Sequence, residues 1–324
     1  MTPAQLAPRH VPLVHLLRDG MVEGVHHGSV VVLAPDGSTM FEAGDPDVAM
    51  YPRSTAKPLQ ATAMARLGLR LGASGFAIAA ASHSGEPMHL AAAAETLAGH
   101  GLDEDALGNP ADLPFDPVER DAWVAADRKP SRLAHNCSGK HAAMLATCRE
   151  RGWDLAGYLD PGHPLQQAIR ETVEDLTGDA VARVAVDGCG APLFAVSLRG
   201  LARAAARIAT APADSPERLV AEAIRQRPEL VAGTRRDVTG LMRAVPGLIA
   251  KDGFEAVQLA ALPDGTSIAV KIADGGDRAR KAVLAAALTH AGVREEVLAP
   301  YRDPCLPVIT GLATPPARLS AKSV

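Results

Sequence analysis

The sequence predicts an α+β fold, in which helices flank an antiparallel sheet and a helical lobe lies beside it. The first observation is a pair of apolar hairpins, one towards each end of the chain. The second is a long middle region with helical patterns and without regular alternation of strand and helix. No G-x-G-x-x-G follows a predicted strand, so a doubly wound nucleotide-binding sheet is not indicated. Pairing the two hairpins in one sheet is the natural closure of such a chain.

The two hairpins have the same design. Strands are predicted for residues 29–33 and 39–42 near the beginning of the chain, and for residues 256–261 and 267–272 near its end. In both hairpins a Pro-Asp-Gly segment separates the strands, which is typical of a turn. A final helix is expected over residues 278–291.

The middle of the chain is predicted to be mainly helical. An apolar run at residues 76–81 leads into a polar loop, residues 102–130 are rich in Asp and Pro and should be irregular, and residues 182–186 alternate like a strand. The apolar periodicity and the glycines that follow it predict helices over 59–71, 88–97, 142–150, 164–176, 193–208 and 216–225.

The bulk properties describe a globular enzyme-sized chain. Its 324 residues are 47% hydrophobic and 22% charged, and no repeat or linker divides them, so we expect one domain over residues 1–324. The net charge of −4 without a basic block argues against a nucleic-acid partner. No apolar run has the length of a membrane span, and residues 1–18 are broken by prolines and lack the apolar core of a signal peptide. The expected location is therefore the cytoplasm.

Ser54 and Lys57 form an S-x-x-K pair where a predicted helix begins. Residues three apart lie on one helix face, so the hydroxyl and the amine would meet. A lysine in this arrangement can help to activate a serine nucleophile. Taken alone the pair is weak evidence, because two common residues recur at one spacing by chance.

Two further loops contain the remaining parts of a serine and lysine site. Ser82 follows the apolar run and precedes Ser84, which by itself is better explained as a helix cap. Lys251 and Gly253 form a K-x-G at a late strand, which by itself would be a solvated hairpin edge. Together with S-x-x-K they resemble the constellation of β-lactamases and penicillin-binding proteins. A lysine can act as the base only if burial or a second cation lowers its pKa.

A third loop suggests a metal. Cys137 and Lys140 precede a helix, and Cys189 ends a strand some fifty residues later. Two thiolates and a nitrogen donor would suit zinc, although lysine is an unusual ligand, and buried free thiols are the alternative. No C-x-x-C pair occurs, and Cys148 and Cys305 are expected to be packing residues.

These motifs together resemble the rhizobial-type L-asparaginases, also called class 3 or the asparaginase II family. The resemblance rests on segments distributed from about residue 20 to residue 290: R-S-T-A-K-P at 53–58, A-S-H-S at 81–84, N-C-S-G-K-H at 136–141, D-G-C at 187–189 and K-x-G at 251–253. The N-C-S-G-K-H block is the most specific of these segments.

The resemblance implies a fold like that of serine β-lactamases and glutaminases, and a homodimer that hydrolyses L-asparagine to L-aspartate and ammonia. It implies that Ser54 is the nucleophile beside Lys57, and that Ser82 and Lys251 form a second Ser–Lys pair. It further implies a zinc site and surrounding residues that fix the substrate or the metal ligands. The zinc ligands would be Cys137, Lys140 and Cys189, and the surrounding residues Arg53, His141 and Asp187.

Other functions stay open on the sequence alone. Cys137 with His141 could form a thiol nucleophile pair, which would give a different amidohydrolase. A ligand-binding module without catalysis on the same fold is a further alternative. Glutamine is the nearest rival substrate, because it is only one methylene longer than asparagine.

Overall fold

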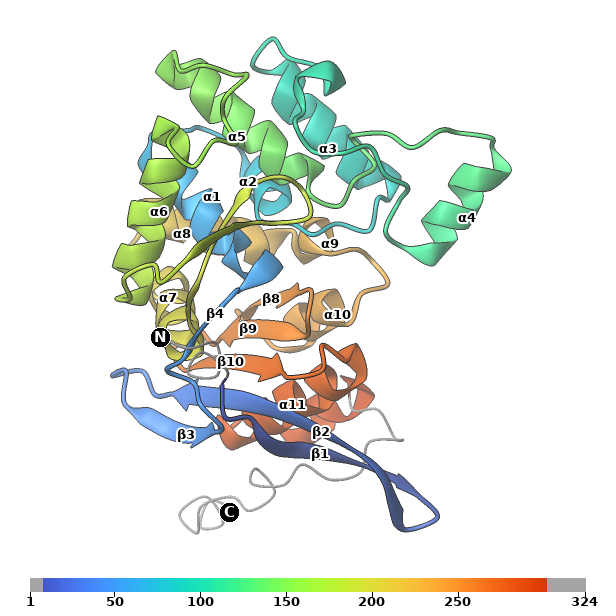
Figure 1. Cartoon of the computed structure of the whole chain (residues 1–324), viewed down its shortest axis with the longest axis vertical. Coiled ribbons are helices and arrows are strands. Elements are labelled where there is room, and N and C mark those ends of the chain that lie inside the picture. Colours follow the sequence, from blue (N-terminus) through green and yellow to red (C-terminus); the bar gives the residue numbers. More distant parts are fainter. Residues whose placement is uncertain (1–7, 302–324) are drawn as a thin grey trace.

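The computed structural model describes residues 8–301, and Cys305 lies outside this range. An antiparallel sheet of six strands forms the lower half of the molecule (Figure 1). Its strands run in the order β1-β2-β10-β9-β8, and β3 pairs with β2. The bounds are β1 Val11–Arg18, β2 Met21–Leu33, β3 Thr39–Ala43, β8 Ile249–Gly253, β9 Val257–Ala261 and β10 Ser267–Ile272.

The two predicted hairpins do pair, through the central strands β2 and β10. Ser267 lies opposite Leu33 and Ile272 lies opposite Gly28 in a register without a bulge. The α+β prediction with one antiparallel sheet is therefore confirmed. Strand β1 was not predicted, because prolines break residues 1–18. Proline is nevertheless tolerated in an edge strand, and β1 is at the edge of the sheet.

The helices largely follow the predicted periodicity. Those at the expected places are α1 Lys57–Arg66, α3 Pro87–Ala98, α5 Ser138–Arg151, α6 Pro164–Thr177, α7 Leu198–Ala209, α8 Pro216–Gln226 and α11 Asp277–His290. Short pieces complete the chain: β4 Ala49–Met50, β5 Val184–Val186, β6 Pro192–Phe194, β7 Val196–Ser197, α12 Glu295–Leu298 and 3-10 turns at Glu104–Ala106 and Ala299–Tyr301.

Four differences from the prediction concern the middle region. The apolar run at 76–81 belongs mainly to a helix, α2 (Ala73–Ala79), and the predicted helix 193–208 begins only at Leu198 because β6 and β7 precede it. The segment predicted to be irregular contains α4 (Pro117–Ala125), whose N-cap Asp116 accepts hydrogen bonds from two backbone N–H groups. Two helices were not anticipated, α9 (Pro228–Val231) and α10 (Asp237–Ala244).

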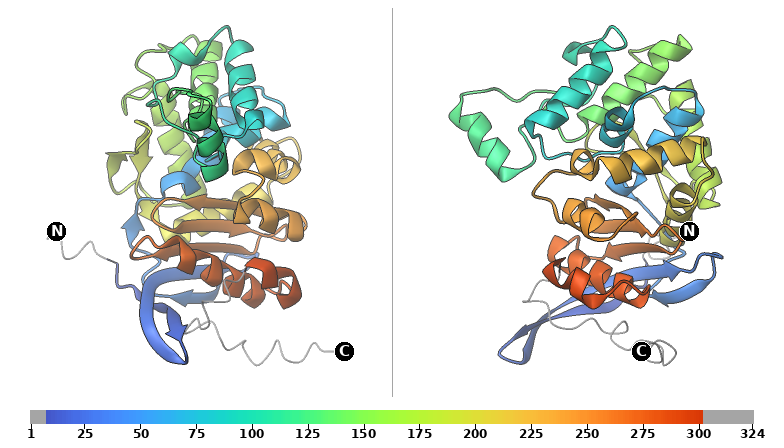
Figure 2. Two further views of the ribbon diagram at one scale, coloured as in Figure 1. Left: turned by 90° about the vertical axis from the view of Figure 1, so that its right-hand side faces the viewer. Right: turned by 180° about the vertical axis from the view of Figure 1, so that it is seen from behind.

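Helices cover both faces of the sheet. α7 packs on β2, β9 and β10, whereas α11 packs on β10 from the other face (Figures 1 and 2). This sandwich explains why β10 is buried along almost its whole length. Helices α1 to α6, with α8 and α9, form the predicted lobe above the sheet.

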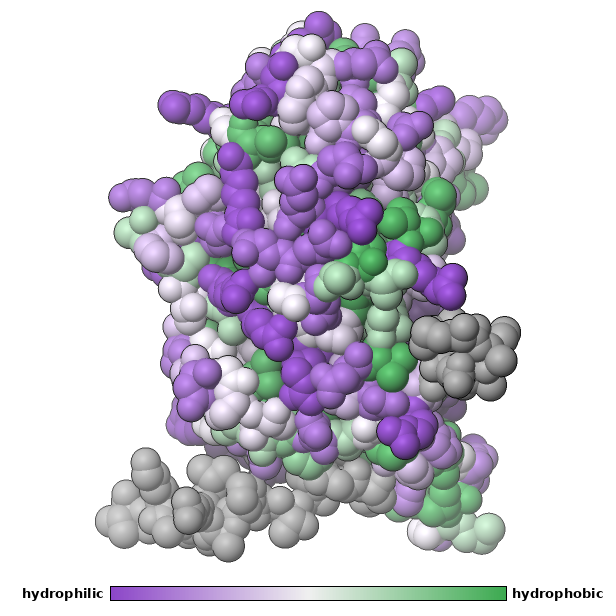
Figure 3. Space-filling view, turned by 60° about the vertical axis from the view of Figure 1, so that its left-hand side comes forward, coloured by the Kyte–Doolittle hydropathy of each residue, from purple (hydrophilic) through white to green (hydrophobic). Residues whose placement is uncertain are grey.

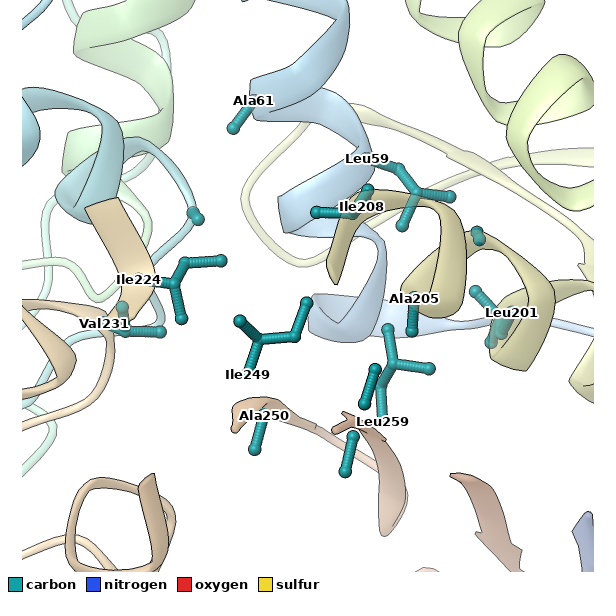
Figure 4. Close-up of a cluster of buried hydrophobic side chains, with 14 of the residues drawn as sticks. Leu59, Ala61, Leu201, Ala205, Ile208, Ile224, Val231, Ile249, Ala250 and Leu259 are labelled. Atoms are coloured by element: carbon teal, nitrogen blue, oxygen red, sulfur yellow. The ribbon is translucent and has the colours of Figure 1, made fainter. Parts of the chain in front are cut away.

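A buried hydrophobic cluster joins the lobe to the sheet (Figure 4). Leu59 of α1 and Ile208 of α7 meet the side chains of Ile249 and Ala250 on β8 and Leu259 on β9. Leu59 lies two residues after Lys57, and Ala250 directly precedes Lys251, so the cluster anchors the chain next to both lysines. The many alanines and leucines of this interior match the low aromatic content, which is 3%.

The outer surface is mainly hydrophilic, with separate hydrophobic patches on the face shown in Figure 3. Within residues 8–301, no helix combines the length and the apolar character that crossing a bilayer requires.

Candidate active site

Ser54 lies on a short 3-10 helix, η2 (Arg53–Ala56), which continues directly into α1 at Lys57. The Ser54 residue is 4% exposed. Arg53, just before it, has a φ of 51°, in the left-handed region that ordinary residues rarely adopt. Such strain at a non-glycine residue is common where a chain presents a functional side chain.

Lys57 is buried, and its amine is held by three acceptors. Its Nζ donates to the carbonyl oxygen of Ala81 at 2.6 Å, to Ser82 Oγ at 2.9 Å and to Cys137 Sγ at 3.0 Å. One lysine therefore links the S-x-x-K turn, the serine loop and the cysteine loop. The direct Ser–Lys contact in the described structure is between Lys57 and Ser82.

The loop with Ser82 is held on both sides by backbone hydrogen bonds. The N–H of Ser82 donates to Val231 O at 3.0 Å, and the N–H of His83 donates to Asn136 O at 3.0 Å. The residue before Asn136 and the residue after it, His135 and Cys137, are also buried. Ser82 is therefore fixed between the cysteine loop and the last residue of α9.

Lys251 is buried in the middle of β8. Its Nζ donates to the carbonyl oxygen of Asp252 at 2.6 Å and to Asp252 Oδ1 at 2.9 Å. Burial, opposed by the carboxylate of Asp252 and assisted by the charge of Lys57, lowers the pKa of Lys251 to about 8. Burial acts to raise the pKa of Asp252, but Lys251 and Arg236 hold it well below its usual range. The resemblance implies a Ser82–Lys251 pair. In the structure, the Lys251 amine donates hydrogen bonds to Asp252.

The glycine of the K-x-G segment allows β8 to approach the serine turn closely. A Cβ at Gly253 would lie 3.2 Å from Pro52 O and 3.2 Å from the backbone nitrogen of Thr55. Because both contacts are to backbone that brackets Ser54, only glycine lets the lysine strand pack against the nucleophile turn without displacing it.

The cysteine loop brings together the three residues that the sequence predicts as metal ligands. Lys140 Nζ donates to Cys189 Sγ at 3.1 Å. Hydrogen bonding to Cys189 and burial raise the pKa of Cys137, whereas that same bond and the charge of Lys140 hold the pKa of Cys189 well below its usual range. The two cysteines therefore share a proton unequally, with Cys189 favoured as the thiolate next to the amine of Lys140.

Gly139 is required for this arrangement. A Cβ at that position would lie 2.4 Å from the carbonyl oxygen and 2.4 Å from Cγ1 of Ile78 on α2. The glycine thus lets the first turn of α5, which contains Lys140 and His141, lie directly against α2.

The donor set fits a zinc ion. Within residues 8–301, no group of three His, Cys, Asp or Glu side chains is suitable to hold a metal. A centre here therefore needs the amine of Lys140 beside the sulfurs of Cys137 and Cys189. The imidazole of His141 borders this donor set, within hydrogen-bonding reach of Cys189. Cysteine sulfur is a common zinc ligand, whereas a lysine amine is an unusual one.

The residues predicted to fix the substrate or the metal lie around this cluster. Arg53 Nε donates to Asp187 Oδ1 at 3.0 Å, so these two predicted residues form one pair. His141 Nδ1 lies 2.6 Å from Tyr158 Oη, and burial lowers the pKa of the imidazole to about 4. The imidazole is therefore neutral and oriented by the tyrosine hydroxyl.

A cavity of about 370 Å³ opens onto both serines. Ser54 and Ser82 line it, whereas Cys137 is not among its lining residues in the described chain. Its other walls are Phe115, Asn136, Arg235, Arg236, Asp237, Asp252, Gly253, Phe254, Glu255, Ala256, Gly275, Asp277, Arg280 and Lys281. The charged wall was missed, although the run Arg235-Arg236-Asp237 could have been noticed as a charge cluster between helices.

The sequence matches a known protein family. The family model described as L-asparaginase II matches residues 14–309. The chain belongs to the L-asparaginase II family. The predicted family is thereby confirmed, and membership supports amidohydrolase activity. No curated protein matches the sequence significantly.

Solved structures show distant likenesses to this L-asparaginase II family member. The protein Mglu in its native form is 16% identical with a TM-score of 0.43, over 82% of this chain and 63% of Mglu. A β-lactamase from Mycobacterium bovis, Mb2281c, is 17% identical with a TM-score of 0.39, over 85% of this chain and 95% of the β-lactamase. The hydrolase EstCE1 is 13% identical with a TM-score of 0.40, over 76% of this chain and 88% of EstCE1. The chain thus spans less than two thirds of the length of Mglu.

Proposed function

We propose that this protein hydrolyses the side-chain amide of L-asparagine to L-aspartate and ammonia, with Ser54 as the nucleophile. The observation that carries the proposal is that two buried serines line one cavity, that the buried Lys57 donates to one of them, and that the buried Lys251 donates to Asp252 in the wall of the same cavity. Membership of the L-asparaginase II family selects an amide as the substrate. A cavity of about 370 Å³ suits a small amino acid.

In the proposed reaction, Ser54 Oγ attacks the side-chain amide carbon while Lys57 takes the hydroxyl proton. Ser82 Oγ, 2.9 Å from Lys57 Nζ, shares that proton, and Lys251 provides a second amine whose lowered pKa favours proton acceptance. The proton then passes to the leaving nitrogen, and ammonia departs. Water cleaves the aspartyl ester and restores the Ser54 hydroxyl.

The negative oxygen of the intermediate needs donors in a fixed position. The first turn of a helix has N–H groups without intrahelical partners, and Ser54 is the second residue of η2. We assign the backbone N–H of Ser54 to this oxygen.

Cys137, Lys140 and Cys189 would hold the zinc ion, which when bound would supply a positive charge that orients the substrate next to the serines. Two hydrogen bonds orient the side chains around the site: Tyr158 orients His141, and Asp187 orients Arg53. In this scheme Lys140 must lose its proton on metal binding, although the neighbouring sulfurs, acting against burial, raise its pKa.

The proposal is tested by the release of ammonia from L-asparagine in a coupled assay. Ser54→Ala should lower kcat by at least about 10³-fold, since it removes the nucleophile. Ser84→Ala is the matched control, because Ser84 is a buried serine on the neighbouring loop that does not line the cavity. Near-normal release by Ser54→Ala would sink the proposal. The same assay with L-glutamine measures the preference for asparagine over glutamine. A difference of one methylene typically changes such a preference by about 1–3 kcal/mol.

A further inference from the structure

One guanidinium group in the cavity wall is incompletely paired. Arg236 lines the cavity together with Ser54 and Ser82. Its Nη2 forms an ion pair with Asp252 Oδ2, whereas its Nη1 is buried and has no hydrogen-bond partner among the described residues. A buried N–H group without an acceptor costs free energy, so native proteins rarely leave one unless a ligand completes it.

The other two arginines of this wall do not share this feature. The guanidinium of Arg235 is held by the carboxylates of Asp116 and Glu119. The guanidinium of Arg280 is held by two carboxylates, and it also donates to the side-chain oxygen of Gln258. Among these three arginines, Arg236 is the one with a buried nitrogen that has no hydrogen-bond partner among the described residues.

The charge balance around Arg236 also favours an anion. Lys251 and Arg236 share a single carboxylate, that of Asp252, and Arg236 lines the cavity with the two serines. One carboxylate shared by two basic side chains leaves this end of the cavity positive, because a Lys251 amine with a pKa of about 8 is mostly protonated near neutral pH. A negative group on the substrate would complete the balance.

Arg236 is also held in position before any ligand arrives. Asp252 holds one edge of the guanidinium, and the ring of Phe115 lies over its face, with Cζ 5.0 Å from the ring centroid. The free edge is the one that contains Nη1. A fixed guanidinium edge is suited to a carboxylate, which accepts from arginine in a planar geometry.

We propose that Arg236 binds the α-carboxylate of the substrate amino acid and so restricts the enzyme to free amino-acid amides. This inference rests on the proposed function, because it places the side-chain amide of the same molecule at Ser54. Arg53, the residue for which the sequence predicts substrate contact, already donates to Asp187 and is not among the residues that line the cavity, so Arg236 is the better-placed guanidinium for this carboxylate.

The test compares L-asparagine with β-alaninamide, which is asparagine without its α-carboxylate. Arg236→Gln should lower kcat/KM for L-asparagine by about 100-fold and leave kcat/KM for β-alaninamide within about threefold. Arg236→Lys, which keeps the charge but not the planar fork, should fall between Arg236→Gln and the unmodified protein. Arg243→Gln is the control, because Arg243 lies on α10 and pairs with Glu229 away from the cavity.

An equal loss for the two amides in Arg236→Gln would overturn the inference, since it would mean that Arg236 acts through Asp252 and Lys251. Thermal unfolding of each variant shows whether it is folded. Calorimetric titration of L-asparagine into the Ser54→Ala background separates the two proposals. If hydrolysis is absent but Arg236→Gln still weakens L-asparagine binding about 100-fold, only the proposed function fails. If the affinity is unchanged, the α-carboxylate assignment fails whatever the activity.

Discussion

The rate of asparagine hydrolysis should rise with pH through about 8, because Lys251 is a buried amine with a pKa lowered to about 8. A lysine accepts a proton only in its neutral form, and the neutral form accumulates as the pH rises through the pKa of the folded protein. A group that titrates at pH 8 is about one-tenth neutral at pH 7 and about nine-tenths neutral at pH 9. The ratio kcat/KM should therefore increase about ninefold between these values.

Asp252→Asn tests the cause of that pH dependence. The Asp252 carboxylate, 2.9 Å from Lys251 Nζ, raises the pKa of the lysine against the larger effect of burial. Its removal should move the midpoint of the profile to lower pH by about 1–3 units, whatever happens to the maximum rate. The profile is measured as kcat/KM for L-asparagine from pH 5 to pH 10.

Asp277→Asn provides the control for this experiment, because Asp277 is a carboxylate of the same cavity that pairs with Arg280. Its midpoint should stay at the value of the unmodified protein. A flat profile between pH 6 and pH 9, or a midpoint that moves upward in Asp252→Asn, would refute the assignment of Lys251 as a proton acceptor.

Two further predictions concern helix α5 and the cysteine cluster at its N-terminus. Gly139→Ala should destabilise the protein by about 1–3 kcal/mol, because the new Cβ would lie 2.4 Å from Ile78 O, although helix propensity alone predicts a gain of about 1 kcal/mol. Denaturant unfolding gives the sign, and Gly72→Ala, where no heavy atom lies within 4 Å, should be close to neutral. Cys189→Ala should abolish stoichiometric zinc binding measured by elemental analysis, whereas Cys148→Ala should retain it; equal zinc content in the two variants would contradict the ligand set.

The sheet could be predicted because its strands are continuous apolar runs separated by clear turns. The segments 29–33 and 267–272 are covered by helices on both faces, so their sequences are mainly apolar, apart from Ser29, Ser267 and Lys271. The edge strand β1 and the helix α4 were missed for the opposite reason. Each has only a partly buried face and contains or adjoins proline, so local pattern was weak and tertiary contacts decide its structure.

The motif residues of the site were predictable because they occur in short polar segments next to apolar helices and strands. The structure shows which of them touch: Lys57 meets Ser82 and Cys137, which are 25 and 80 residues away in the chain. Arg236 could not be selected in this way. Its role depends on an unpaired nitrogen in a cavity wall, and no local pattern distinguishes it from Arg235 beside it.

The covalent intermediate gives the most direct test of the central claim, that Ser54 is the nucleophile. The protein would be mixed with L-asparagine, quenched in acid within the first turnover, digested and analysed by mass spectrometry. The predicted result is an aspartyl ester on the peptide that contains Ser54, absent from Ser54→Ala. The same adduct on the Cys137 peptide would contradict the serine mechanism and establish the thiol pair instead.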